Sequence, residues 1–174
     1  MGLHVGASLV KRALIGPPPG RLNTLQSTSL ALVVLIPIHA SVHRFIPSSP
    51  TPPISGLSPS HLDYEYVKAG LHQWPLTSWA LYALLIGAML THALEGSHVI
   101  YRKWLRRPRV SRNQEALGRP WIKYVPTAIA TGLALSVLGG IRVLSNEASY
   151  ASSRLASRIE ASYLQSFVFR WTAH

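Results

Sequence analysis

The stretch ALYALLIGAMLTHALEGSHVIYRKWLRRPR, residues 80–109, decides the fold class of this chain. It opens as an uncharged apolar run and ends in a dense cluster of arginines. An apolar run of this length predicts a membrane-spanning helix, and the basic cluster marks the side on which the helix leaves the membrane. Three ionisable side chains interrupt the second half of the run: His92, Glu95 and His98.

The composition agrees with a membrane protein. Only 13% of the 174 residues are charged while 48% are hydrophobic, which favours a small multi-pass protein over a soluble domain. The net charge is +11, and almost half of the 17 basic residues gather between two apolar runs, so the charge indicates a membrane surface and not nucleic acid as the partner. The chain has no cysteine, which excludes disulfides and iron–sulfur clusters.

Three apolar runs predict three transmembrane helices, over residues 24–46, 76–101 and 122–144. We therefore expect a basic tail over residues 1–23 and a transmembrane domain over residues 24–144. Pro37 lies inside the first run and predicts a kink there. Small residues in the third run favour tight helix contacts, at Gly132, Gly139 and Gly140.

Residues 145–174 predict an amphipathic helix. Apolar residues recur every four positions between charged ones, at Leu155, Ile159, Tyr163, Phe167 and Trp171. Such a helix is expected to lie on the bilayer surface, and the alternative is a helix that packs back on the bundle. The fold class is therefore an all-α membrane protein with three transmembrane helices and a C-terminal amphipathic interfacial helix.

An odd number of spans fixes which segments share a membrane face. The basic tail and the loop after the second span lie on one face, where the membrane-interface cations are Arg102, Lys103, Arg106 and Arg107. The proline-rich segment 47–74, with a short helix expected over residues 61–71, lies on the other face with the C-terminal helix.

The histidines suggest a cofactor as one alternative. His39 and His92 are the most interior, and neutral imidazoles on facing helices are the usual axial ligands of haem b in membranes. Counting residues from the helix ends places the two at depths that differ by about 12 Å. His39 and His43, one turn apart, have the alternative of bonding carbonyls near Pro37. We find no catalytic or metal-ligating pattern, so we expect a non-enzymatic protein without a metal.

Two segments resemble the cytochrome b anchor subunits of succinate dehydrogenase. His92-Ala-Leu-Glu-Gly96 is similar to that family's His-x-x-x-Gly motif, and Ser41-Val42-His43-Arg44 to its quinone-side motif. This resemblance implies a haem b-binding anchor of a redox complex, with His92 as an axial ligand.

The chain as a whole resembles the transmembrane domain of the fungal mitochondrial adapter family. The resemblance covers residues 25–144 and rests on the order of short motifs: Thr28-Ser29-Leu30, Pro37-Ile38-His39, His43-Arg44-x-x-Pro47, Thr91-His92 to Gly96, Tyr101-Arg102-Lys103 and the glycine-rich third span.

That resemblance implies a multi-pass protein of the mitochondrial outer membrane that complements loss of a tether at organelle contacts. It implies recruitment of a lipid-transfer protein in support of lipid homeostasis. The family's recruiting element is a Pro-x-Pro segment, and this chain has two, Pro17-Pro18-Pro19 and Pro50-Thr51-Pro52. Family members carry two copies of the domain, so a chain with one copy is expected to form a homodimer.

Overall fold

The computed structural model describes residues 23–105 and 124–172, and every regular element within these ranges is a helix. In chain order these are α2 (Thr24–Ala40), the π-helical turn η1 (Ser41–Phe45), the 3-10 turn η2 (Pro59–His61), α3 (Tyr64–Gln73), α4 (Pro75–Ile100), the π-helical turn η3 (Tyr101–Leu105), α5 (Val125–Asn146), α6 (Ser153–Gln165) and α7 (Phe167–Trp171). The all-helical class is confirmed, and α3 confirms the short helix expected near residues 61–71.

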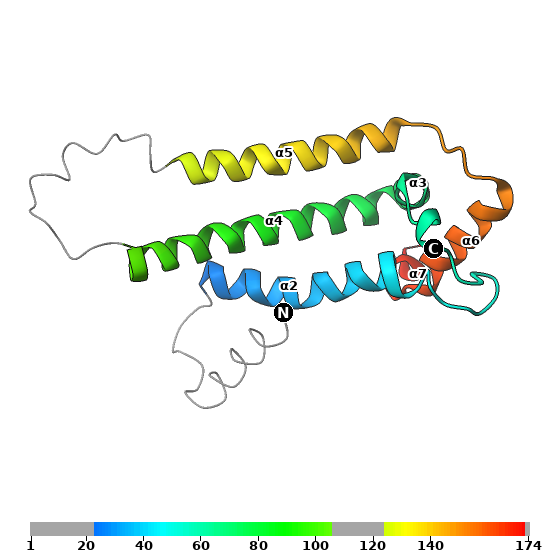
Figure 1. Cartoon of the computed structure of the whole chain (residues 1–174), viewed down its shortest axis with the longest axis horizontal. Coiled ribbons are helices and arrows are strands. Elements are labelled where there is room, and N and C mark those ends of the chain that lie inside the picture. The colour runs from blue at the N-terminus through cyan, green and yellow to red at the C-terminus, as the bar shows by residue number, and fades with distance from the viewer. Residues whose placement is uncertain (1–22, 106–123, 173–174) are drawn as a thin grey trace, which may run out of the picture.

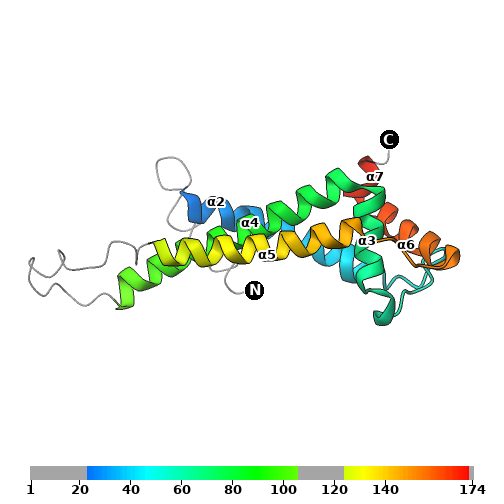
Figure 2. The same ribbon diagram turned by 90° about the horizontal axis from the view of Figure 1, so that it is seen from above.

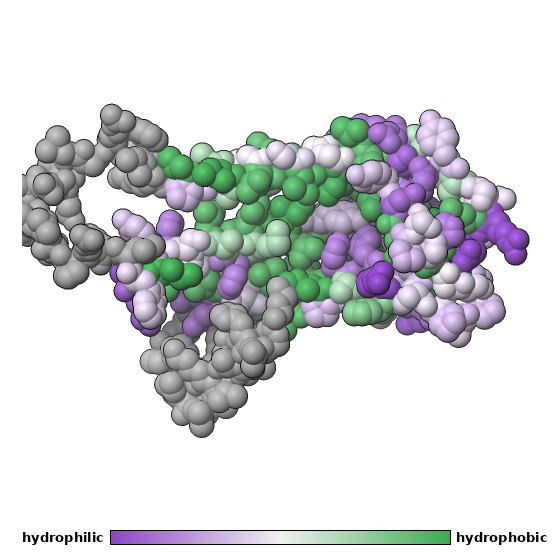
Figure 3. Space-filling view, viewed as in Figure 1, coloured by the Kyte–Doolittle hydropathy of each residue, from purple (hydrophilic) through white to green (hydrophobic). Residues whose placement is uncertain are grey.

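Among the residues that the structure describes, three helical segments are long and apolar enough to cross a membrane: Thr24–Phe45, Pro75–Trp104 and Val125–Asn146. The three predicted spans are therefore confirmed, although the expected start of the third at Ile122 lies outside the described residues. The helix α4 lies between α2 and α5, and the three form one layer (Figures 1 and 2). On the face seen in Figure 3, apolar residues predominate along the middle of this layer, while hydrophilic residues gather most densely at the end that carries α3, α6 and α7.

The layer leaves most of its surface uncovered by the chain itself. Only 6%, 11% and 6% of the residues in the apolar windows of the three spans are buried. A Cβ added at Gly87, Gly132, Gly139 or Gly140 would meet no atom within 4 Å. The prediction of tight helix contacts at the glycines of α5 is therefore wrong for the described part of this chain, because these glycines face no other helix in it.

The first span begins and ends at recognisable local signals. Asn23 and Gln26 form a capping box, in which the Asn23 side chain accepts from the Gln26 N–H at 2.8 Å and the Gln26 side chain accepts from the Asn23 N–H at 3.3 Å. At the other end, the Ile46 N–H bonds the Ser41 carbonyl at 2.9 Å, which makes the last turn π-helical. Since Pro47 has no N–H, the Val42 carbonyl is left for a partner outside the helix.

That end of the layer carries a small folded unit, the cap, made of residues 47–74 and 147–172. Its core joins the proline-rich loop and α3 to the C-terminal helices and also includes Val42 of the first span. The other buried residues of this core are Ile54, Leu57, Tyr66, Trp74, Ile159, Tyr163 and Phe169. Tyr66 and Tyr163 stack with their ring centroids 4.8 Å apart. The C-terminal segment is therefore packed on the rest of the chain, which corresponds to the second of the two arrangements expected for it.

The C-terminal helix is also divided in two. Ser166 is extended and separates α6 from α7, so the four-residue stripe predicted from Leu155 to Trp171 does not continue. Ile159 and Tyr163 are buried as expected, but Phe169 takes the next core position, while Phe167 and Trp171 are 60% and 82% exposed. The prediction of a single amphipathic helix is therefore wrong beyond Ser166, and two exposed aromatic rings remain at the surface of α7.

A polar network ties α3 to the segment that follows α5. Lys68 is buried and its ammonium contacts Glu65 at 2.8 Å, Glu147 at 3.1 Å and the Ala148 carbonyl at 3.3 Å. Glu65 in turn accepts from the Ser149 hydroxyl and the Tyr150 N–H, both at 2.9 Å. These bonds fix the direction in which the chain leaves the third span and enters the cap.

Candidate functional site

The proline-rich loop presents one of the two Pro-x-Pro segments at the surface of the cap. Pro50, Thr51 and Pro52 are all exposed. The base of the loop is closed by backbone hydrogen bonds, from the Leu57 N–H to the Pro47 carbonyl at 2.8 Å and from the Gly56 N–H to the Ser49 carbonyl at 2.7 Å. Ile54 and Leu57, 3% and 4% exposed, pin the loop to the cap core.

Arg158 of α6 braces this loop from a distant part of the sequence. Its Nε donates to the Ile54 carbonyl at 2.8 Å, and its Nη2 donates to the carbonyls of Ser55 and Gly56, both at 3.2 Å. Ser55 and Gly56 have φ values of 54° and 61°, a left-handed turn that brings these carbonyls toward one guanidinium. The planar, forked guanidinium suits several acceptors at once, so α6 holds the loop in one conformation.

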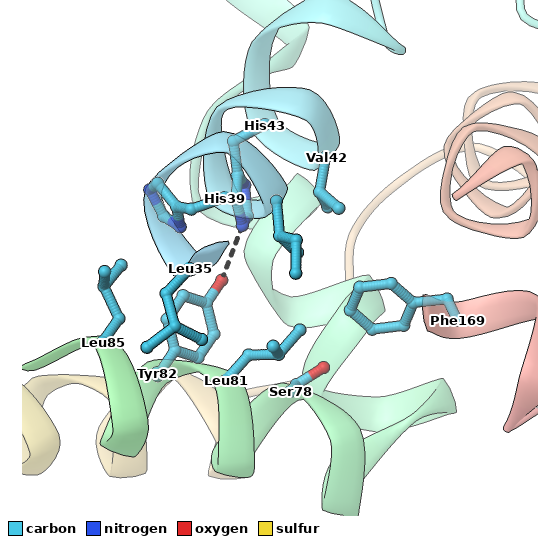
Figure 4. Close-up of a pocket in the computed structure, with 10 residues that line it drawn as sticks. Leu35, His39, Val42, His43, Ser78, Leu81, Tyr82, Leu85 and Phe169 are labelled. Atoms are coloured by element: carbon cyan, nitrogen blue, oxygen red, sulfur yellow. Dashed lines mark hydrogen bonds between the residues drawn. The ribbon is translucent and has the colours of Figure 1, made fainter. Parts of the chain in front are cut away.

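A second polar cluster lies where α2 and α4 approach the cap. His39 and His43 project from the first span with ring centroids 4.5 Å apart, and the Tyr82 hydroxyl of α4 lies 3.2 Å from His43 Nε2 (Figure 4). The residues around them are mainly apolar: Leu35, Ile38, Val42, Leu81, Leu85 and Phe169, with Ser78 as the other polar one. The alternative expected for His43 was a hydrogen bond to a backbone carbonyl near Pro37. The structure instead shows His43 bonded to the Tyr82 hydroxyl of α4.

His92 lies toward the opposite end of the same helix pair. Its Nδ1 is 3.3 Å from the hydroxyls of Thr28 and Ser29, so this histidine links α4 to the start of α2. Ser29 and His39 are ten residues apart in α2, and so are Tyr82 and His92 in α4, which is about 15 Å at helical rise. The structure therefore does not bring His39 and His92 together, and a haem with both as axial ligands does not fit this arrangement.

The remaining predicted site residues lie at the basic end or outside the described residues. Arg102 and Lys103 are exposed in the turn η3, at the end of α4 away from the cap. Arg106, Arg107, Pro17 and Pro19 lie outside the described residues.

Two residues of these sites, Arg158 and Tyr82, were not predicted from the sequence. Arg158 reads as one of several charges on an amphipathic helix, and Tyr82 as an interruption of an apolar run. Tyr82 could have been identified, because a phenol within an apolar helix needs a hydrogen-bond partner and the histidines of the first span are candidates.

Comparison with known proteins assigns the family. Residues 34–149 match the model of the transmembrane domain of MDM10-complementing protein 1, which is more than half of the chain. No curated protein sequence matches the chain. No solved structure matches it. The matched range contains the last part of α2, all of α4 and α5, and the proline-rich loop with α3. The chain therefore belongs to the family defined by the transmembrane domain of MDM10-complementing protein 1, a family of membrane proteins linked to mitochondria.

Proposed function

We propose that this chain is a non-enzymatic adapter of the mitochondrial outer membrane. It recruits a lipid-transfer protein at organelle contacts and thereby supports lipid homeostasis. Family membership supports the mitochondrial membrane setting. The observation that carries the recruiting role is the exposed and braced segment Pro50-Thr51-Pro52.

The order of this segment suits recognition by a soluble partner. The chain turns at Thr51, where the Thr51 carbonyl accepts from the Ser55 N–H at 3.0 Å, so the exposed prolines are presented on a preformed turn and little conformational entropy is lost when a partner binds them. Bracing by Arg158 lowers that loss further, because the loop is ordered before it binds. The second Pro-x-Pro segment, at Pro17 and Pro19, lies on the opposite membrane face in a three-span topology, so only one of the two meets a cytosolic partner.

The basic end contributes contacts with lipid. Arg102 and Lys103 are exposed where α4 ends, and the sequence continues with Arg106 and Arg107. A cluster of this kind is attracted to anionic headgroups by about 1 kcal/mol per cation. Membrane lipids are thus the expected partners at this end. The soluble protein partner binds on the face of the membrane that meets the cytosol.

Recruitment is tested with two double variants of the full chain, Pro50→Ala with Pro52→Ala and Pro17→Ala with Pro19→Ala. The probe is a fluorescent bridge-like lipid-transfer protein of the same cell, measured as the fraction bound to purified mitochondria. Pro59→Ala is the matched control, since Pro59 is also exposed in the proline-rich loop but lies outside the Pro-x-Pro segment. We expect the Pro50/Pro52 variant to lose most of the bound fraction. If neither double variant reduces it while both insert normally, the adapter proposal is wrong.

We propose further that two copies of the chain associate in the membrane. A Cβ added at Gly87, Gly132, Gly139 or Gly140 meets no atom of the described residues, which leaves room for a close helix neighbour of the kind with which transmembrane helices associate. Gly139→Leu would fill that space and is expected to convert dimers to monomers in mild detergent. Light scattering measures the mass, and Val137→Phe, exposed on the opposite side of the same helix, tests whether added bulk alone has this effect.

A further inference from the structure

The cluster of His39, His43 and Tyr82 is not used by the recruiting role. His43 is bonded to the Tyr82 hydroxyl at 3.2 Å. Within residues 23–105 and 124–172, no group lies at hydrogen-bond distance from the imidazole of His39, although its ring lies 4.5 Å from that of His43 and 6.4 Å from that of Tyr82, centroid to centroid. An imidazole without a partner is costly inside a membrane span, because the hydrocarbon offers no hydrogen bond. The side chain of His39 is exposed, so a ligand can reach it.

The space between these side chains limits what that ligand is. The cavity that His39, His43 and Tyr82 line measures about 20 Å³. One water-sized occupant needs roughly 10–15 Å³, so the cavity holds a single ion or water molecule and is far too small for a lipid headgroup. Its other walls are mainly leucine and isoleucine side chains (Figure 4).

The spacing of the two histidines suits a metal ion. Side chains at positions i and i+4 of a helix lie one above the other, and this is the spacing with which helical histidine pairs hold zinc. The following turn, Ser41–Phe45, is π-helical, a distortion that occurs often at functional sites. Among the described residues no group of three His, Asp or Glu is gathered for a metal, so the third ligand has to come from another residue type.

We propose that His39 and His43 bind one divalent transition-metal ion of the class that prefers imidazole, Cu²⁺ or Zn²⁺. Tyr82, whose hydroxyl lies 3.2 Å from His43 Nε2, supplies the third contact through its oxygen, and the ion fills the cavity between the three side chains. Imidazole nitrogen is a preferred ligand for both ions, and the apolar walls exclude competing water. The ion would join α2 to α4 next to the cap.

The test uses the full chain in detergent with Cu²⁺ as the probe. Equilibrium dialysis measures stoichiometry and affinity, and electron paramagnetic resonance counts the bound nitrogens. We expect one Cu²⁺ with two imidazole nitrogens. In His39→Ala one nitrogen is lost and the affinity falls at least about tenfold, since loss of even an outer partner typically costs 10–100-fold. Tyr82→Phe keeps the ring packing and is expected to weaken binding less.

Two controls keep the result interpretable. His72→Ala removes an exposed histidine at the same end of the molecule, whose Nε2 is 3.2 Å from the Ser145 carbonyl, and should leave the Cu²⁺ site unchanged. Because His39 is exposed, its replacement should not unfold the chain, and equal thermal unfolding of the metal-free proteins checks this. If wild type binds no Cu²⁺, or binds it as tightly after His39→Ala, the cavity holds only water and the proposal fails. Neither result bears on recruitment through Pro50 and Pro52.

Discussion

The Tyr66 hydroxyl donates a 2.8 Å hydrogen bond to the carbonyl of Val42, which joins the cap to the end of the first span. The acceptor is available because Ile46 bonds Ser41 instead and because Pro47 lacks an N–H. The Ser162 hydroxyl, 3.1 Å away, completes the bonding of the phenol oxygen. One contact thus connects the first span, α3 and α6, three segments that are distant in sequence.

Tyr66→Phe should therefore destabilise the protein by about 1–3 kcal/mol, because a buried carbonyl and the Ser162 hydroxyl lose their partner while the ring packing stays. The free energy of unfolding in detergent measures it. Tyr64→Phe is the control on the same helix, since Tyr64 is 70% exposed, and it should change stability by less than about 0.5 kcal/mol. Equal effects of the two variants would mean that the bond to Val42 contributes nothing.

Gly70→Ala tests the close approach of α3 to α6. A Cβ at this position would lie 2.6 Å from the Tyr163 hydroxyl oxygen and 2.7 Å from the adjoining ring carbon. The Tyr163 ring is 1% exposed and packed against Tyr66, Trp74 and Phe169, so it has little room to move, and a cost of about 1–3 kcal/mol is expected.

Gly87→Ala gives the opposite expectation in the same experiment. Its Cβ meets nothing within 4 Å in the middle of α4, so the gain in helix propensity leaves stability unchanged or slightly higher. A Gly70→Ala protein as stable as Gly87→Ala would show that α6 does not pack on α3 as described.

Arg158→Ala removes three hydrogen bonds from the braced loop. We expect a loss of about 1.5–3 kcal/mol and faster proteolysis between Pro47 and Gly56, because the carbonyls of Ile54, Ser55 and Gly56 lose their donor. Arg158→Lys should rescue only in part, since an ammonium lacks the forked geometry. Arg154→Ala, exposed on the same helix, is the control, and a loop that is cleaved no faster in Arg158→Ala than in this control would contradict the bracing role.

The network around Lys68 predicts acid sensitivity. The hydrogen bond from Lys68 is the main cause that lowers the pKa of Glu65 to about 2, with further bonds from Tyr150 and Ser149. A carboxylate whose pKa is lowered on folding contributes stability that is complete above its usual pKa of 4.5 and is lost as the pH falls through about 2.

Glu65→Gln should therefore flatten the decline in stability between pH 4.5 and pH 2, measured by thermal unfolding across that range. Glu160→Gln, at an exposed position of α6, serves as the matched charge control and should decline as wild type does. An unchanged acid profile in Glu65→Gln would mean that this carboxylate is not held by the network.

The sequence alone predicted the spans and not what packs on them. The spans follow from the length and apolarity of three runs, which are local properties. The helix α3 follows from the stretch between Pro59 and Pro75, which contains no proline. The cap depends on pairs such as Tyr66 with Ser162 and Tyr66 with Tyr163, almost a hundred residues apart. An apolar stripe shows that one face of a helix is covered, but it does not show what covers that face. The stripe therefore did not distinguish a helix that lies on the bilayer surface from one that packs on α3.

The arrangement of the histidines followed from the sequence only in part. Helix counting gave the correct result that His39 and His92 lie at different depths, because rise per residue is fixed. It did not show that Tyr82 faces His43, since the rotation of α4 about its axis depends on packing with α2. Ser166 divides the C-terminal helix without a proline or glycine, and no local signal marks it.

The most direct test of the account is the sidedness of the two ends of the helical layer. The chain has no cysteine, so single cysteines introduced as Thr51→Cys in the cap loop and Lys103→Cys at the basic end report only their own positions, and both are exposed. A membrane-impermeant maleimide is applied to intact mitochondria and then to mitochondria with a ruptured outer membrane. Three spans predict that one site is labelled in intact mitochondria and the other only after rupture, with Ser157→Cys of α6 behaving like Thr51→Cys. Labelling of Thr51→Cys and Lys103→Cys from the same side would contradict the account.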